Sequence, residues 1–466
     1  MGKLRFLLAL WLAKLSVPVL KLTHHNGSNF PGIVAIRLCP DFLRYVGRPK
    51  TVVAVTGTNG KTTVSNLLSD LLEADGQRVM SNRSGSNMIF GISAAYVLNS
   101  DLLGRAGGKV DVAILEVDER SSLKVHPDLK PDYLVVTNLC RDSTMRHAHP
   151  DFMKGIITRA LPKETKLILN ADDMISCDIA PENPRVTYGI DRMPGDTVEC
   201  VNLLNDRPVC PRCCGKLEYV YRRYHHFGKA VCRDCGFSSP ESTYLARQVD
   251  TAQRTMVLTE DGEDHPYRLV SDSVFNIYNM VAVIAALRQL GWSHEKIRGY
   301  MDKAAVLSTR YQECDIGNYH VVSHLAKGLN AFATSRTFQY VADRPGRKEL
   351  FLMINDLSCE HNWSENVCWL YDSDFELLAR DEITQVVCTG LRGIDYKLRL
   401  LLAGVPEDRV FYEENDLKAL DLLHFTPGDD IYLLHDVEDY QTERLMNRIT
   451  ELANEHSAKE GEHHEN

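Results

Sequence analysis

Residues 51–63, which read TVVAVTGTNGKTT, have the residue types and spacing of a phosphate-binding site. A β-branched run over 51–55 predicts a buried strand, a loop with two glycines follows, and the next residues have the apolar spacing of a helix. Backbone N–H groups in such a loop and the positive end of the helix attract an anion. Lys61 can reach the β- and γ-phosphates of a nucleotide, and Thr62 can bind Mg²⁺ through its hydroxyl. The predicted ATP-binding residues of this segment are Gly57, Thr58, Asn59, Gly60, Lys61, Thr62 and Thr63.

The loop differs from the common phosphate-binding spacing in one respect. It reads G-x-x-G-K-T rather than G-x-x-x-x-G-K-T, because Val55 stands at the position of the first glycine. A plain glycine turn before a helix is the alternative interpretation. The lysine and threonine, together with the strand and helix on either side, favour the phosphate site.

Four cysteines form two C-x-x-C pairs, Cys210 with Cys213 and Cys232 with Cys235, and eighteen residues separate the pairs. Each pair can hold a metal ion in a tight knuckle, and four thiolates complete a tetrahedral Zn²⁺ site. Because a closed site of four cysteines leaves no open coordination position, the predicted zinc is structural. Cys214 could compete as a ligand, but the C-x-x-C geometry favours Cys213.

The elements around the phosphate loop predict an α/β fold with a central parallel sheet. Apolar runs that resemble buried strands alternate with helix-like runs, and they lie at 112–115, 133–139 and 166–169. Ligands of such sheets bind at the carboxyl ends of the strands. Polar residues lie at the carboxyl ends of these runs, namely Glu116, Asp118, Asn138 and Asn170. Glu116 is the predicted protein ligand of Mg²⁺, with Thr62 as the second.

The strand-and-helix pattern begins again after residue 310, with strand-like runs at 349–354, 385–388 and 430–434. This repetition predicts a second, smaller α/β domain. We expect an N-terminal helical segment over 1–48 and a central ATP-binding domain over 49–305, with the zinc ribbon inserted at about 205–240. We expect the C-terminal domain over 306–453. The polar, His- and Glu-rich residues 454–466 predict a disordered tail.

The composition excludes some functions and indicates a compartment. The 466 residues are 25% charged and 44% hydrophobic, as in ordinary globular proteins. The net charge of −10 argues against a general nucleic-acid binder, so no nucleic-acid partner is expected. Thirteen cysteines without a disulfide framework indicate a reducing compartment, which is the cytoplasm.

The first twenty residues are basic and then apolar, as in a signal peptide. However, Lys14 interrupts the apolar run, no cleavage site of the A-x-A kind follows, and the run is too short to span a bilayer. The segment instead predicts an amphipathic helix. That helix packs on the neighbouring domain or lies on a membrane surface, and the sequence leaves both open.

These motifs resemble the Mur ligases, and among them the MurT-type ligase subunits of lipid II isoglutaminyl synthases. The resemblance covers nearly the whole chain. TGTNGKTT is similar to the ATP loop of the family, and the cysteine ribbon is a trait of the MurT type. Further similar segments are SNRSGSNMIFGI (81–92), LEVDE (115–119), TNLCRD (137–142), LNADD (169–173), FNIYN (275–279), TRYQE (309–313) and CTGLRGIDYKLRLLLAGV (388–405).

The resemblance implies an ATP-dependent carbon–nitrogen ligase of peptidoglycan biosynthesis. It would amidate the α-carboxyl of D-glutamate in the lipid II stem peptide through an acyl phosphate. A GatD-like class I glutamine amidotransferase would supply ammonia as the second subunit of a heterodimer, at or near the inner face of the membrane. Lys61, Mg²⁺ and Arg310 would neutralise charge on the γ-phosphate. Asn276 and Asn279 would contact the nucleotide, although helix capping or core hydrogen bonding explains them equally well.

Three segments depart from the family pattern. Residues 142–149 replace a D-Q-L-D-R-Y-like run, and their His147 and His149 are new metal ligands or, as is commoner for loop histidines, surface residues. Residues 326–331 keep Lys327 but lose an Asn-Pro step. Residues 354–376 lack the A-D-G of a run that carries an aspartate thought to complete the Cys–His pair of the glutaminase.

The third departure concerns that aspartate. Counting back from Trp369 places Trp363 and Asn366 where the family has aspartates. An aspartate there would orient the histidine and stabilise its cation, which an amide does poorly. Three nearby carboxylates could substitute, namely Asp356, Glu360 and Glu365, and spacing does not choose among them. Asp356 is the predicted C-terminal catalytic carboxylate.

Three functions therefore remain open from the sequence. The first is the amidation of lipid II. The second is the same chemistry on another carboxylate or with another amine, which the altered segments 142–149 and 356–368 suggest. The third is a nucleotide-binding scaffold without catalysis. The intact Lys61, Thr62 and Glu116 argue against the scaffold, which has little need of them.

Overall fold

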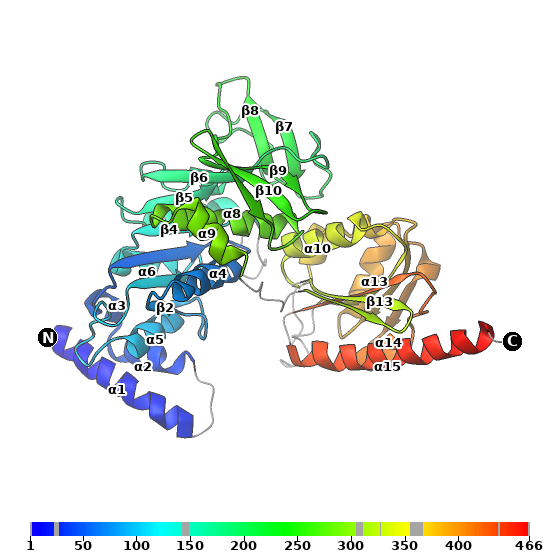
Figure 1. Cartoon of the computed structure of the whole chain (residues 1–466), viewed down its shortest axis with the longest axis horizontal. Helices are drawn as coiled ribbons and strands as arrows, with labels where there is room; N and C mark the ends of the chain where they lie inside the picture. Colours follow the sequence, from blue (N-terminus) through cyan, green and yellow to red (C-terminus); the bar gives the residue numbers. More distant parts are fainter. Residues whose placement is uncertain are drawn as a thin grey trace. The chain divides into compact units, whose positions relative to one another are not determined.

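The computed structural model of the chain describes residues 2–22, 28–141, 149–303, 311–326, 328–354, 367–436 and 439–464 (Figure 1). The described residues form two compact units. The first lies within Met1–Val306, and the second within Leu307–Asn466 together with Arg141 and Asn202–Leu204. The first unit contains the phosphate loop and the cysteine ribbon.

A nine-stranded sheet forms the centre of the first unit, in the order β11-β10-β9-β6-β5-β4-β1-β3-β2. Its strands are β1 (Thr51–Thr56), β2 (Val79–Ser81), β3 (Val112–Glu116), β4 (Tyr133–Val136), β5 (Lys166–Asn170), β6 (Arg185–Ile190), β9 (Tyr244–Asp250), β10 (Thr255–Glu260) and β11 (Glu263–Arg268). The ladder is parallel from β2 to β9, and β10 and β11 are antiparallel. Strands β1, β3, β4 and β5 are almost wholly buried, which explains their nearly continuous apolar sequences.

Helices cover this sheet. They are α4 (Lys61–Ala74), α5 (Ile89–Asn99), α6 (Ser122–Leu129), α7 (Pro150–Ala160), the short 3-10 helix η2 (Ser176–Asp178), α8 (Val274–Gln289) and α9 (His294–Met301). Helix α4 buries Val64, Leu68, Leu71 and Leu72, the apolar spacing that predicted it. Helix α8 is buried on nearly every side over 277–287, so its sequence is apolar all round.

Three N-terminal helices pack beside the sheet, namely α1 (Gly2–Leu22), α2 (Phe30–Leu38) and α3 (Phe42–Tyr45). Phe6 and Leu10 of α1 belong to the same hydrophobic core as Ala35 of α2 and Phe42 of α3. Of the two arrangements that the sequence left open, the structure shows packing on the domain through one face of α1. The expected amphipathic character is absent, because the opposite face is apolar as well. Among the described helices, none combines the length and apolar character needed to cross a bilayer.

The cysteine ribbon is built on a separate antiparallel pair, β7 (Leu217–Tyr224) and β8 (Phe227–Cys232), inserted between β6 and β9. Its small apolar cluster combines Met174 of the main domain with Leu217, Tyr219 and Ala230 of the hairpin. A core of that size cannot hold a fold by itself, which indicates that further interactions stabilise the insertion.

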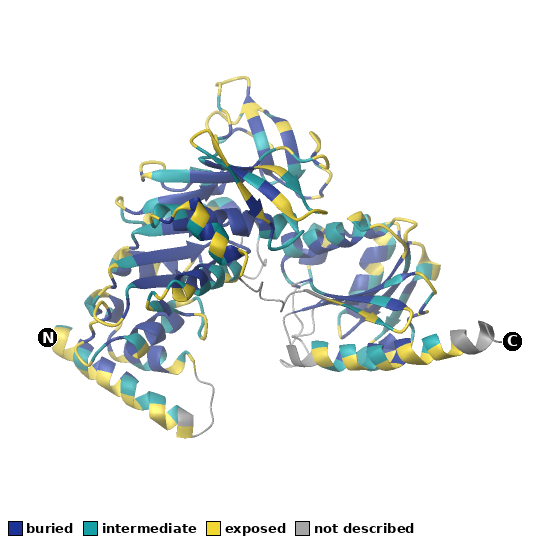
Figure 2. Cartoon of the chain, in the orientation of Figure 1, coloured by how far each residue is buried: buried dark blue, intermediate teal, exposed yellow. Residues whose placement is uncertain are grey.

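The second unit contains a six-stranded sheet in the order β12-β13-β17-β14-β15-β16. Its strands are β12 (Tyr311–Ile316), β13 (Tyr319–Leu325), β14 (Lys348–Met353), β15 (Ile383–Thr389), β16 (Val410–Glu413) and β17 (Asp430–His435), and all pairs except β12–β13 are parallel. Its helices are α10 (Ala331–Asp343), α12 (Trp369–Asp372), η4 (Phe375–Leu378), α13 (Gly393–Leu402), η5 (Glu407–Arg409), α14 (Asp416–Leu420) and α15 (Asp439–His464). Two hydrophobic cores pack with this sheet, as the buried bands of Figure 2 show.

The predicted fold class is confirmed, since a central parallel sheet and a smaller α/β unit are both present. The disordered tail predicted from Asn454 is wrong as far as His464, because α15 continues through these residues. Leu452 and Ala453 anchor the helix in the core, and the Ser457 hydroxyl accepts a hydrogen bond from the Asn318 N–H at 2.9 Å. The Ala, Lys and Glu residues that follow favour helix propagation, which polar composition alone did not reveal.

Candidate functional site

The phosphate loop connects the carboxyl end of β1 to the amino end of α4. Gly57 and Gly60 adopt φ values of +128° and +84°, which glycine accommodates far better than other residues. A Cβ atom at Gly57 would lie 2.2 Å from the Thr137 hydroxyl, so the site requires glycine for space as well. The loop is thus held in one conformation by the strand that precedes it and the segment that follows β4.

Residues after β4 fix the backbone of the loop. The Thr58 N–H donates to the Asn138 carbonyl at 2.8 Å, and the Asn59 N–H donates to the Asn138 side-chain oxygen at 3.1 Å. The Thr137 hydroxyl and the Asn138 amide both donate to the Asn59 carbonyl, at 2.6 and 2.9 Å. The polar residue predicted at the end of this strand therefore shapes the loop.

Lys61 begins α4, and its ammonium turns back over the loop. It donates to the Gly57 carbonyl and forms an ion pair with Glu119 at 3.0 Å, with 12% and 7% of the two side chains exposed. Burial lowers the pKa of Lys61, but the Glu119 carboxylate outweighs burial, so this pKa lies above its ordinary value of 10.5. The ammonium is therefore charged at neutral pH and oriented at the mouth of an anion-binding loop.

Glu119 is a site residue that the sequence reasoning missed. It belongs to the acidic cluster 116–119, from which Glu116 was chosen because it ends the strand. The signal was present, because a buried lysine requires a counter-charge and this cluster supplies three carboxylates. The choice among them depends on how the chain turns after β3.

Glu116, the last residue of β3, is held by asparagines. The side-chain amide of Asn87 donates to its carboxylate at 3.0 Å, while Asn82 bonds its backbone N–H and carbonyl, each at 2.9 Å. The Ser86 N–H in turn donates to the Asn29 side chain at 2.8 Å. Glu116 is half-buried and keeps coordination capacity, and its charge also helps to hold the pKa of Lys61 high.

Of the two residues predicted to bind the metal, Glu116 lies at the end of β3 and Thr62 in the first turn of α4. In the β1–β3 ladder Val55 lies opposite Glu116, and β1 leads through the loop to Thr62 in the first turn of α4. Thr62 is exposed at this helix end. Carboxylates outnumber the lysine around the loop, which suits a bound divalent cation such as Mg²⁺.

Asn276 and Asn279 lie in the first turns of α8, behind the loop. The Asn279 amide donates to the Asn276 oxygen at 3.2 Å, and Asn276 donates to the Ser271 hydroxyl at 3.3 Å. A Cβ atom at Gly60 would lie 2.3 Å from the Asn279 side-chain oxygen. Asn279 is 3% exposed, so it supports the glycine turn from the protein interior.

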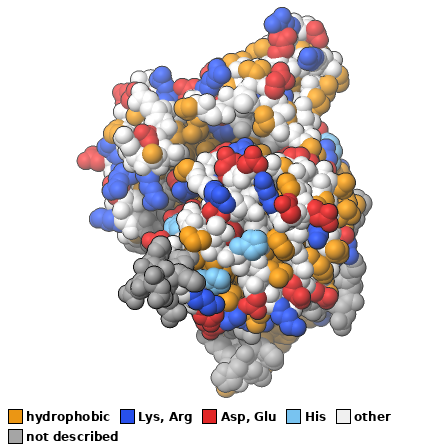
Figure 3. Space-filling model, turned by 90° about the vertical axis from the view of Figure 1, so that its right-hand side faces the viewer, with side chains coloured by type: hydrophobic (Ala, Val, Ile, Leu, Met, Phe, Trp, Pro, Cys, Tyr) orange, Lys and Arg blue, Asp and Glu red, His pale blue; other side chains and the backbone are white. Residues whose placement is uncertain are grey.

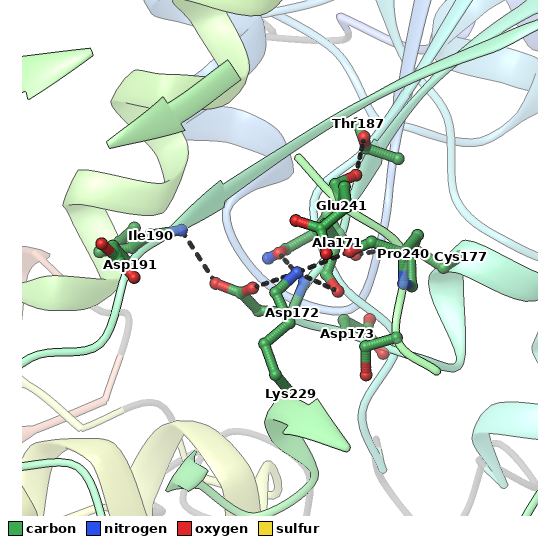
Figure 4. Close-up of polar contacts among 12 residues, drawn as sticks. Ala171, Asp172, Asp173, Cys177, Thr187, Ile190, Asp191, Lys229, Pro240 and Glu241 are labelled. Carbon is green, nitrogen blue, oxygen red and sulfur yellow. Dashed lines mark hydrogen bonds and ion pairs between the residues drawn. The ribbon is translucent and has the colours of Figure 1, made fainter. Parts of the chain in front are cut away.

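A second acidic pair, Asp172 and Asp173, follows β5 at the same edge of the sheet and is fully buried. Asp172 accepts from the Ile190 N–H at 2.9 Å and lies 3.1 Å from the Lys229 ammonium, as Figure 4 shows. A second cation, the Arg223 guanidinium, lies 3.5 Å from the Asp172 carboxylate. These contacts join the ribbon hairpin to the main sheet.

Asp173 completes this anchor. It accepts from the Leu139 N–H at 2.7 Å and lies 3.1 Å from the His226 ring in the hairpin turn. Burial raises the pKa of Asp173, but the hydrogen bonds from His226 and the backbone outweigh it and keep the pKa below its ordinary value. The LNADD segment therefore holds the ribbon in place.

The four predicted zinc ligands converge at the tip of the ribbon. The sulfurs of Cys210, Cys213, Cys232 and Cys235 all lie within 4.8 Å of one another. Two of these separations are 3.5 and 3.6 Å, while Zn–S bonds of about 2.3 Å place tetrahedral sulfurs about 3.8 Å apart. Backbone N–H groups of Arg212 and Gly215 donate to the first two sulfurs at 3.4 Å, which stabilises thiolates. The donor set therefore fits a structural zinc, and Cys214 lies outside it.

Several predicted residues lie outside the described part of the chain. They are Arg310, Asp356, His147, Lys327 and the candidates within 355–366. His149 is described, and its ring accepts from the Asp151 N–H at 3.3 Å as the N-cap of α7. It therefore has a structural role in the fold.

Comparisons with known proteins agree with this geometry. The profile of the Mur ligase middle domain matches residues 55–199, and that of the MurT ligase C-terminal domain matches residues 327–437. The lipid II isoglutaminyl synthase (glutamine-hydrolyzing) subunit MurT of Staphylococcus aureus (strain COL) is 30% identical over 417 residues, which cover 88% of this chain and 91% of the relative. The subunit of the same name from Streptococcus pneumoniae (strain ATCC BAA-255 / R6) is 27% identical, with coverage of 88% and 90%.

Solved structures share the fold. A pseudomurein peptide ligase type C from Methanothermus fervidus aligns with a TM-score of 0.65 at 20% identity, over 88% of this chain and 81% of that one. MurF from Acinetobacter baumannii aligns with a TM-score of 0.61 at 15% identity, over 90% and 80%. The fold and the phosphate-loop domain are thus those of the Mur ligases. Within that class, the chain belongs to the MurT family, as its identity over most of its length shows.

Proposed function

We propose that this protein is the ligase subunit that amidates the D-glutamate α-carboxyl in the stem peptide of lipid II. The observation that carries the proposal is the charged Lys61 at the phosphate loop, ion-paired with Glu119, in a chain 30% identical to a MurT subunit. The names of the relatives state the synthase activity and the hydrolysis of glutamine.

The proposed reaction has two steps. A carboxylate oxygen of the substrate attacks the γ-phosphorus of ATP, so that ADP leaves and an acyl phosphate forms. Ammonia then attacks the carbonyl carbon, phosphate leaves with the transferred carboxylate oxygen, and the nitrogen loses its proton to solvent. Lys61 and the loop N–H groups stabilise negative charge on the transferred phosphoryl group. Arg310 is proposed to add a second cation.

Mg²⁺, when bound, would neutralise negative charge on the phosphate groups. Glu116 and Thr62 are the residues proposed to hold it. Asn87 and Asn82 orient Glu116 through the hydrogen bonds described above, which fixes a ligand before the metal arrives. Asn276 and Asn279 are proposed to act on the nucleotide through the shape of the loop.

We assign zinc to the four-cysteine cluster and a structural role to that zinc. The ribbon has little apolar core of its own, so metal binding would supply much of its folding free energy. One zinc per chain, lost together with ribbon structure on chelation, is the expected result of metal analysis. Asp356 remains our proposed carboxylate for the partner's active site.

The proposed partner is a GatD-like glutamine amidotransferase subunit that delivers ammonia to the acyl phosphate. The proposed location is the cytoplasm, with contact to the inner face of the membrane where a lipid-linked substrate resides. Copurification with a coexpressed glutaminase subunit at equal stoichiometry tests the partner. We expect the chain alone to use ammonium salts but not glutamine, and to use glutamine once the glutaminase subunit is added. Failure of the two chains to copurify would contradict the proposed heterodimer.

Product mass spectrometry tests the reaction itself. Purified protein receives lipid II, ATP, Mg²⁺ and an ammonium salt, and Lys61→Ala serves as the inactive control. We expect replacement of the α-carboxyl hydroxyl by an amino group in the wild-type reaction only. ATP binding without any amidated product would contradict lipid II as substrate and favour another carboxylate, which the altered segments 142–149 and 354–376 also suggest.

A further inference from the structure

Helix α1 has two apolar faces, of which the core uses only one. Phe6, Ala9, Leu10 and Ala13 are buried against the neighbouring helices. The opposite face leaves large apolar side chains exposed, namely Leu4, Leu8, Trp11, Leu12, Leu15, Val19 and Leu22. At 3.6 residues per turn these positions fall within about 100° of arc. They form one continuous stripe along the helix, visible as exposed segments of α1 in Figure 2.

The loop after α5 widens this stripe. The Trp11 indole N–H donates to the Leu102 carbonyl at 2.8 Å, which fixes the ring and ties the loop to α1. Leu102 and Leu103 are 66% and 52% exposed. We call the stripe together with Leu102 and Leu103 the α1 patch. An exposed apolar surface of this extent marks an interaction site rather than ordinary surface.

The charge around the α1 patch indicates what it binds. The first forty residues contain five Lys or Arg and no Asp or Glu, in a chain whose net charge is −10. Lys3 and Arg5 are exposed beside the stripe. By contrast, the surface in Figure 3 shows acidic and basic side chains mixed among apolar ones. Helix α1 itself has only basic charged residues, while Asp101 lies in the flanking loop beside Leu102. An apolar stripe with a tryptophan on such a basic helix matches the anionic headgroup layer of a membrane.

We propose that the α1 patch binds the surface of an anionic lipid bilayer, with α1 lying in the plane of the headgroups. The buried face of α1 keeps the helix attached to the domain, while the exposed face enters the lipid. This inference rests on the proposed function in one respect, because a lipid-linked substrate gives the contact its purpose. A second copy of the chain could also cover an apolar stripe, but the facing patches would then bring equal positive charges together.

The N-terminal helices also contact the loop that holds Glu116. Asn29, at the N-cap of α2, accepts from the Ser86 N–H, and Ser86 lies in the loop between Asn82 and Asn87. Helix α2 packs with α1 in the same core. Membrane contact through α1 would therefore hold the Glu116 loop in a unit that is fixed on the lipid surface.

Sedimentation with vesicles tests the proposal in the absence of any substrate. The wild-type chain, Leu15→Glu and Leu402→Glu are mixed with phosphatidylcholine vesicles with or without phosphatidylglycerol. Leu15 and Leu402 are 63% and 64% exposed, but Leu402 belongs to α13 in the other unit, so it is a matched control. We expect wild type and Leu402→Glu to bind the anionic vesicles with similar affinity. The affinity of Leu15→Glu should be at least about tenfold lower.

Three results would overturn the proposal. They are no binding of wild type to anionic vesicles, binding of Leu15→Glu as strong as that of wild type, and a loss of binding in Leu402→Glu as large as in Leu15→Glu. Sedimentation velocity adds a further arm, since a wild-type dimer that Leu15→Glu converts to a monomer would assign the patch to self-association. Because the mutated side chain is exposed, an unchanged melting temperature is the expected folding control.

A second comparison separates this proposal from the proposed function. Leu15→Glu should amidate a short-chain, water-soluble analogue of lipid II at the wild-type rate. With lipid II embedded in vesicles, the same variant should be about tenfold slower than wild type. If the wild-type chain binds vesicles but amidates neither substrate, the proposed function is wrong and the lipid contact stands. If wild type and Leu15→Glu amidate each of the two substrates at equal rates, the lipid contact is wrong and the proposed function stands.

Discussion

Two acidic segments follow strands of the same sheet and have different roles. Glu116 and Glu119 follow β3 beside the phosphate loop, while Asp172 and Asp173 follow β5. Glu116 is half-buried and its carboxylate is held by a neutral amide, so it can still accept a cation. Asp172 has no exposed surface and already has Arg223 and Lys229 as its cations. Acidic residues at the end of a parallel strand are therefore available for ligands only where the protein supplies no cation of its own.

Removal of Asp172 should have the largest effect, and it should act on stability. Asp172→Ala removes this partner from the buried Arg223 side chain, which keeps Asp196, and from the partly buried Lys229. Loss of one partner of a buried ion pair typically costs about 3–5 kcal/mol. We expect a large drop in the urea midpoint and easier loss of zinc. Asp408→Ala, at an exposed surface position, is the control and should leave both unchanged. An Asp172→Ala protein as stable as wild type would show that Asp172 does not anchor the ribbon, and would remove the contrast with Glu116.

Removal of Lys61 should act mainly on activity, with some loss of stability because Glu119 loses its buried partner. Lys61→Ala takes away the charge that stabilises the transferred phosphoryl group, and we expect substrate-dependent ATP turnover to fall about 10²–10³-fold. Lys124→Ala, an exposed lysine on α6, should retain full activity in the same assay. Turnover within a few-fold of wild type in Lys61→Ala would remove the phosphate loop from the mechanism.

Glu116→Gln should change the requirement for metal. The amide keeps the shape and the contact with Asn87 but weakens a Mg²⁺ ligand, so the Mg²⁺ concentration for half-maximal turnover should rise about 10–100-fold. The urea midpoint should stay close to wild type, because Glu116 has no buried ion pair to lose. A Mg²⁺ titration curve that coincides with wild type would assign the metal to other residues.

Glu119→Gln should shift the pH profile. The pKa of Lys61 is raised in the wild-type protein, so the ion pair is intact at neutral pH and is lost only as pH rises through that raised pKa, above about 10.5. Without the carboxylate, burial lowers the pKa of Lys61, and the alkaline limb of activity should move to lower pH. A pH–rate profile between pH 6 and 10 should therefore show a falling alkaline limb for Glu119→Gln and none for wild type. Profiles that coincide would contradict the assigned pairing.

The phosphate loop could be predicted because its signals are local: two glycines, a lysine and an adjoining strand and helix. Glu119 could not be chosen over Glu116 in this way, since the turn after β3 decides which carboxylate meets Lys61. The anchoring role of Asp172 depends on Arg223 and Lys229, which lie more than fifty residues further along the chain. Long-range pairing of buried charges is not encoded in short patterns.

The cysteine ribbon and α1 show the same division. C-x-x-C spacing is a local signal. It predicted a site of four cysteines, and the four sulfurs do converge. For α1, the sequence showed an apolar helix and left packing and membrane contact as alternatives. The structure shows that one face packs while the other stays exposed, which periodicity alone could not assign because both faces are apolar.

The most direct test of the account follows one oxygen atom. Substrate labelled with oxygen-18 in the D-glutamate α-carboxyl is incubated with the protein, ATP, Mg²⁺ and ammonium, and the released phosphate is analysed by mass spectrometry. An acyl phosphate made at the Lys61 loop predicts one labelled oxygen in each phosphate released with product, and none released from Lys61→Ala. Amide product accompanied by unlabelled phosphate would contradict the mechanism.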